Sequence, residues 1–236
     1  MDELHLLLQI LDVLVNNLMK EAVGWDRKDN FNKKKADHKD CHVQKLQSTI
    51  RSCGVSFDIW EKINADGKGS GQYDFTSLLG SDKKKLLADL LRKLTECTKQ
   101  ETSATVIQLW QKFQKLYLII TDKNTSPSAA ENYFIKAKEW INLFVSLKDK
   151  LIGYKRADVT PYMHSLVYHV PLFIKKYKSV KLFTGQGVEK NNDMARNIVL
   201  RKSNKRNPAA DVLRLESRQW ELREQQREKQ SYSKKI

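Results

Sequence analysis

The 236-residue chain contains 9 glycines and 4 prolines, too few for a turn-rich sandwich or barrel, and its 40% of apolar residues argue against wholesale disorder. Its 43 lysines and arginines against 28 aspartates and glutamates give a formal net charge of +15. Such a charge favours a polyanionic partner, nucleic acid first. Three widely separated cysteines, Cys41, Cys53 and Cys97, exclude a disulfide framework and indicate a reducing compartment.

No secretory or membrane segment is predicted. Met1, Asp2 and Glu3 are acidic overall where a signal peptide would be basic. The longest apolar stretch, residues 4–15, is interrupted by polar side chains and is too short to span a bilayer. We therefore expect a soluble intracellular protein without a membrane partner.

The N-terminal quarter predicts helices and a turn. Leucines at spacings of three and four predict an amphipathic helix over residues 2–22, ended by Gly24. An exposed polar connection is expected over 26–39 and a second helix over 40–52. The glycine-rich stretch 64–71 is expected to be a turn. It is not an EF-hand, because Lys68 and Phe75 stand where oxygen ligands are needed, and it lacks the ending of a phosphate loop.

The middle of the chain predicts further helices over 82–97, 103–121 and 128–150. Each of these helices carries apolar and aromatic residues along one face, and these residues are most simply explained as core. They are Leu86, Leu90, Leu94, Trp110, Phe113, Tyr133, Phe134, Trp140 and Phe144. Another helix is expected from Pro161 to about Tyr177, with a kink at Pro171.

A tight loop at 183–187 precedes predicted helices over 188–201 and from Ala209 onward. The whole pattern predicts a mainly α, multi-helix globular fold with a basic C-terminal helix. We expect an N-terminal helix in residues 1–23, a helical domain in 24–180 and a C-terminal segment in 181–236.

Positive charge concentrates near the C-terminus. Residues 171–236 hold 17 lysines and arginines against 7 aspartates and glutamates, so +10 of the +15 lies in the last 66 residues. A basic helix face can displace counterions from duplex phosphates. The alternative is that Glu216, Glu221, Glu224 and Glu228 pair with the arginines of the last helix and neutralise it, although the stretch before Pro208 lacks such compensation. The predicted phosphate contacts are Arg196, Arg201, Lys202, Lys205, Arg206, Arg214 and Arg218.

Metal and nucleophile motifs are weak. The His and Cys residues between 38 and 53 match no common zinc spacing. His164 and His169 are five residues apart, which on an α-helix separates them by about 140° and keeps them from sharing a zinc ion. No flanking motif indicates a nucleophilic serine or cysteine.

Two acidic residues remain as candidates. Glu189 follows a Gly-Gln-Gly turn at a helix start, where a carboxylate also meets the helix dipole favourably. Asp2 has the same structural explanation at the start of the first helix. Spacing alone therefore leaves both a catalytic and a structural role open for each residue.

Longer blocks of the sequence point to a family. These blocks are DELHL at 2–6, CGVSFDIW at 53–60, GQYDFTS at 71–77, VTPYMH at 159–164, YHVP at 168–171 and FTGQGVEKNND at 183–193. Together they resemble the C-terminal part of transposon-derived DDE/DDD transposases with an RNase H-like catalytic fold, broadly of the CACTA-Mirage-Chapaev kind. The resemblance covers nearly the whole chain.

The resemblance implies three carboxylates that hold two Mg²⁺ or Mn²⁺ ions for attack on a phosphodiester. It assigns the second acid to Asp2 and the last to Glu189, as catalytic and metal-binding residues, and it makes residues 24–180 the helical insertion of the RNase H-like fold. The first acid is expected upstream of Met1, so this chain is expected to need no cofactor and to be inactive alone. A nuclear location follows from the same resemblance.

Three functions stay open at this point. The favoured one is a transposase-derived fragment of mobile-element origin that binds DNA without catalysis, as a monomer or a homo-oligomer. The second is the C-terminal half of an active metal-dependent transposase or nuclease. The third is a helical protein-interaction module whose basic surface meets an acidic protein.

Overall fold

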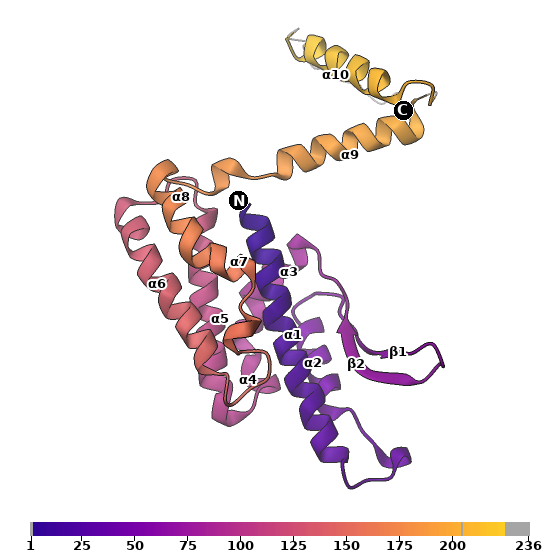
Figure 1. Cartoon of the computed structure of the whole chain (residues 1–236), viewed down its shortest axis with the longest axis vertical. Coiled ribbons are helices and arrows are strands. Elements are labelled where there is room, and N and C mark those ends of the chain that lie inside the picture. Colours follow the sequence, from indigo (N-terminus) through magenta and orange to yellow (C-terminus); the bar gives the residue numbers. More distant parts are fainter. Residues whose placement is uncertain (1, 204, 225–236) are drawn as a thin grey trace, which may run out of the picture. The chain divides into compact units, whose positions relative to one another are not determined.

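The computed structural model describes residues 2–203 and 205–224 (Figure 1). Apart from one two-stranded hairpin, the regular structure of these residues is helical, which confirms the predicted mainly α class. The chain divides into two compact units, residues 1–184 and residues 185–236. No helix in the described ranges is long and apolar enough to cross a bilayer.

The first unit contains eight α-helices and a hairpin within its described residues. In chain order they are α1 (Glu3–Asn30), α2 (Cys41–Arg51), β1 (Ile59–Ile63), β2 (Gly69–Phe75), α3 (Gly80–Asp89), α4 (Leu94–Cys97), α5 (Gln100–Thr121), α6 (Pro127–Ser146), α7 (Pro161–His164) and α8 (Val170–Tyr177). The second unit contains α9 (Gln186–Arg201) and α10 (Pro208–Glu224).

The helices of residues 1–184 pack around one apolar core. Helix α1 contacts α2, α3, α5 and α7, while α6 packs between α5 and α8 (Figure 1). The predicted aromatic stripes are confirmed, since Trp110, Phe113 and Trp140 are fully buried. The Trp140 indole Nε1 donates to the Leu109 carbonyl at 3.1 Å and so joins α6 to α5. Phe134 was expected in this core but is 37% exposed.

Helix α1 is longer than predicted. It continues through Gly24 and ends at Asn30, so the expected polar connection begins later. The buried Asp26 carboxylate accepts from the backbone N–H groups of His42 and Val43 at the start of α2. Asn30 exchanges two hydrogen bonds with the backbone of Lys39. These bonds to residues farther along the chain satisfy the polar side chains of Asp26 and Asn30, which the local sequence pattern predicts to be exposed.

The glycine-rich stretch is the turn of a hairpin. Strand β1 pairs antiparallel with β2, with Ile59 opposite Phe75 and Glu61 opposite Tyr73. Gly67 takes φ +77° in the turn, where glycine carries little steric cost. The turn was predicted and the flanking strands were not. The Asp66-Gly67 dipeptide between two β-prone runs is the signal that indicates them.

The predicted helix over 82–97 is interrupted. Helix α3 ends at Asp89, a 3₁₀ turn follows over Leu90–Arg92, and α4 completes the segment. Its leucines still face the core, because Leu86, Leu90 and Leu94 are fully buried.

The distortion expected at Pro171 takes the form of a π-turn over Ser165–His169, directly before α8. A proline lacks the N–H that an α-helical ladder needs, and a π-turn is a common way to accommodate such a break. The wider turn brings the His164 and His169 rings to a centroid distance of 5.3 Å. The predicted separation of about 140° is therefore wrong, because it assumed regular α-helical geometry.

Candidate nucleic-acid interface

The described residues between α9 and α10, which exclude residue 204, make several hydrogen bonds with polar side chains. The Ser203 hydroxyl donates to the Asp211 carboxylate at 2.8 Å and accepts from the Lys205 N–H at 3.0 Å. Asn207 accepts from the Ala210 N–H and so caps α10, which begins at Pro208. Lys205 takes a left-handed φ of +64°. Local polar residues thus hold the backbone of this turn and leave its cationic side chains outside.

Four predicted phosphate contacts belong to this turn, which we call the cationic turn: Arg201, Lys202, Lys205 and Arg206. All four are exposed. Within the described residues, no carboxylate lies within 4 Å of the charged groups of Arg201, Lys202 or Lys205. For Arg201, Lys202 and Lys205, the lack of neighbouring acids in the sequence is therefore matched by a lack of ion pairs in the described part of the folded chain.

The three other predicted contacts lie on the helices. Arg196 reaches the Asp193 carboxylate at 3.5 Å, and Arg214 reaches Asp211 at 4.0 Å. Arg218 is exposed on α10 and makes no ion pair with Glu221 or Glu216 in the described part of that helix. In the described part of the last helix, Arg214 therefore pairs with Asp211 and not with one of the expected glutamates.

Asp2 acts structurally at the start of α1. Its Oδ1 accepts from the Leu4 N–H at 2.9 Å, and its Oδ2 lies 3.2 Å from His5 Nδ1. The adjacent Glu3 is buried, and burial raises its pKa, with Asp2 adding to the shift and Lys181 opposing it. An N-terminal carboxylate in this position stabilises the helix by capping and by the dipole.

Glu189 lies in the first turns of α9, and its side chain is outside the part of the molecule that the structure describes. Asp2 and Glu189 belong to separate units. Among the described side chains, no three His, Cys, Asp or Glu residues gather as a metal site. The catalytic and metal-binding roles that the resemblance implies for Asp2 and Glu189 stay predictions.

The cysteines differ in exposure. Cys53 and Cys97 are buried, and burial raises the pKa of both thiols, to about 12 for Cys97. Cys41 is exposed at the start of α2. His42 beside it lies 2.9 Å from the Asp29 carboxylate, and His38 contacts the Lys33 carbonyl at 3.1 Å. The two histidines of this region, His38 and His42, thus have separate partners.

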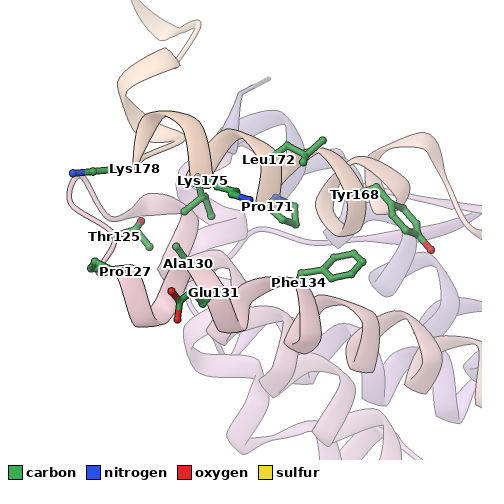
Figure 2. Close-up of a pocket in the computed structure, with 11 residues that line it drawn as sticks. Thr125, Pro127, Ala130, Glu131, Phe134, Tyr168, Pro171, Leu172, Lys175 and Lys178 are labelled. Atoms are coloured by element: carbon green, nitrogen blue, oxygen red, sulfur yellow. The ribbon is translucent and has the colours of Figure 1, made fainter.

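An apolar groove lies between α6 and α8 (Figure 2). It has a volume of about 720 Å³, and Phe134 and Tyr168 face each other across it with ring centroids 6.1 Å apart. Pro171 and Leu172 of α8 form its other wall. The exposure of Phe134 follows from this groove. Its lining is mainly apolar, so it is chemically distinct from the cationic turn.

Comparison of the chain with protein-family models, curated proteins and solved structures yields no match.

Proposed function

We propose that this chain is a DNA-binding protein of transposase origin that contacts the phosphate backbone through the cationic turn. The observation that carries the proposal is the exposure of Arg201, Lys202 and Lys205 without a carboxylate within 4 Å in the described residues. Unpaired surface cations attract phosphates at low salt and release counterions on binding.

The transposase origin rests on the six sequence blocks that resemble this family. Several of them coincide with positions where the fold needs particular residues. Block 159–164 supplies the Thr160 cap and Pro161 at the start of α7, and block 168–171 supplies the proline that follows the π-turn. Blocks 53–60 and 71–77 contribute to the paired strands β1 and β2. These local roles are compatible with the resemblance, which rests on the sequence blocks alone.

The test is binding of a fluorescent 20-base-pair duplex by the full chain, measured by anisotropy over a range of salt concentrations. We expect submicromolar binding at low salt. The triple variant Arg201→Gln/Lys202→Gln/Lys205→Gln should weaken it at least about tenfold. It should also lower the salt slope by about 0.9 for each phosphate that the variant no longer neutralises.

The matched control is Lys84→Gln/Lys115→Gln/Lys123→Gln, which removes the same charge from exposed, unpaired lysines of the first unit. It should change affinity much less. An equal loss in both triple variants would show that net charge alone drives binding. Affinity that does not depend on salt would refute the proposal.

A further inference from the structure

A second cationic surface lies on the first unit, in the loop between α6 and α7. Lys148, Lys150 and Lys155 from this loop and Lys20 from α1 line one cavity of about 320 Å³. Asp149 and Asp158 line it as well, so ammonium groups outnumber carboxylates two to one. All four lysines are exposed, and no acid lies within 4 Å of their Nζ atoms in the described chain.

The loop is held against α1 by a buried hydrogen bond. Asn17 Nδ2 donates to the Gly153 carbonyl at 2.8 Å within the core. Gly153 has φ +89°, and a Cβ atom there would lie 2.2 Å from Asn17 Oδ1, so only glycine fits. The neighbouring Tyr154 is fully buried, with its ring 4.9 Å from that of Phe144. Because its middle is held in this way, the loop presents Lys150 and Lys155 at defined places beside Lys20.

One of the two acids, Asp158, bonds to the backbone. The Asp158 carboxylate accepts from the Lys155 N–H at 2.8 Å and caps the 3₁₀ turn over Arg156–Asp158. The cavity is lined by lysines and by no arginine among the described residues. Lysine is a point charge without the planar fork that recognises one anion of fixed shape, so the cluster fits a run of phosphates better than a single small anion.

We propose that Lys20, Lys148, Lys150 and Lys155 form a second phosphate-contacting surface for duplex DNA. This inference rests on the proposed function in its choice of polyanion, but it concerns a different unit of the chain. Ile152, beside the lysines, is 66% exposed. A single exposed apolar side chain is ordinary on a protein surface, and we therefore favour DNA over a lipid surface.

The experiment compares four full-length variants with the same duplex. The loop variant carries Lys→Gln at positions 20, 148, 150 and 155, and a charge-retaining variant carries Lys→Arg at the same positions. A dispersed control carries Lys→Gln at 34, 84, 115 and 123, which are exposed lysines on four different segments. The fourth is the cationic-turn variant described above. Circular dichroism confirms that each variant is folded.

We expect the loop variant to bind at least about tenfold more weakly than the dispersed control. Its salt slope should fall by about 2 or more, because each phosphate contact contributes about 0.9. The Lys→Arg variant should retain binding. Equal affinities for the loop variant and the dispersed control would overturn the inference. If the cationic-turn variant alone loses affinity, the inference fails and the proposed function stands.

The reverse result, weaker binding only in the loop variant, would support this surface and contradict the cationic turn. Vesicles of phosphatidylserine and phosphatidylcholine form the last arm. Vesicle binding that depends on the four lysines, with DNA binding unchanged, would assign the surface to a membrane and overturn the inference.

Discussion

Glu21 is a carboxylic acid inside the core of the first unit. It lies on α1 with 5% exposure, and neither carboxyl oxygen has a hydrogen-bond partner among the described residues. Burial raises its pKa from 4.5 to about 8, against the opposing charge of Lys99. A neutral acid at this depth avoids the cost of a buried, unpaired charge.

This raised pKa predicts a pH dependence of stability. Between pH 4.5 and 8, the unfolded chain releases the Glu21 proton and the folded chain keeps it. The free energy of unfolding should therefore fall as pH rises across this window, by up to about 1.4 kcal/mol per pH unit from this residue. Glu21→Gln is uncharged throughout and should lose that slope. Urea unfolding at pH 5.5, 6.5 and 7.5 measures the difference.

The control for this measurement is Glu139→Gln. Glu139 is exposed, and its hydrogen bond and ion pair with Lys112 lower its pKa, so it is ionised in both states over the same range. Its removal should leave the pH slope unchanged. Parallel pH curves for the parent chain and Glu21→Gln would contradict the interpretation.

One buried lysine joins α3 to α1. Lys83 is 3% exposed, and its Nζ donates to the Leu8 carbonyl at 2.8 Å and lies 2.6 Å from Asp12 Oδ1. The Asp12 side chain is 40% exposed. The two partners therefore differ in what their removal leaves behind: a hydrated carboxylate in one case and a buried ammonium group in the other.

We expect an asymmetric response. Asp12→Ala leaves the buried Lys83 ammonium group with the Leu8 carbonyl as its remaining partner. It should lower the free energy of unfolding by about 2–3 kcal/mol. Lys83→Met keeps the apolar stem and leaves Asp12 in water, so it should cost about 1 kcal/mol. Glu139→Ala, which breaks an exposed pair, should stay within about 0.5 kcal/mol. Equal effects of Asp12→Ala and Lys83→Met in urea unfolding would refute this account.

The two units differ in how many buried apolar side chains they contain. Among the described residues of the second unit, Ile198 is the one buried apolar side chain, whereas the first unit holds the remaining core. Large exposed apolar residues also lie on α9 and α10, including Leu200, Leu213 and Trp220. Two helices with so little burial lack the apolar area that stabilises an independent domain.

Residues 1–184 should therefore keep their cooperative fold after truncation. We expect a melting temperature within about 3 °C of the full chain, since a change of 1 kcal/mol in a domain of this size corresponds to about 2–4 °C. An isolated peptide of residues 185–236 should show low helicity by circular dichroism. Absence of a cooperative transition in residues 1–184 would show that the second unit completes the core.

Local patterns predicted the parts of this fold that depend on local physics. The period of leucines and aromatics identified the helical class and the burial of Trp110, Trp140 and Phe144, because amphipathic spacing and burial are directly linked. The exposed cations of the cationic turn were also evident, since a charged run without neighbouring acids has few ways to be neutralised. The DNA-binding role that these cations suggest stays a prediction.

The features that sequence reasoning missed depend on contacts between distant residues. Asp26, in the last part of α1, accepts hydrogen bonds from the start of α2, and Asn17 bonds to Gly153 across 136 positions of the chain. The π-turn before Pro171 places two histidines together against the α-helical expectation. Lys20 joins the loop lysines only in the folded chain. No period or motif along the sequence encodes these juxtapositions.

The unequal exposure of the three cysteines makes the unmodified chain suitable for selective labelling. Maleimides react with accessible thiolates, and burial with a raised pKa protects Cys53 and Cys97 in the native state. Cys41 should therefore take up one fluorophore, at the start of α2, without any substitution. One dye per molecule gives a binding signal from the protein itself, so unlabelled DNA of any length or sequence can be compared in a single titration format.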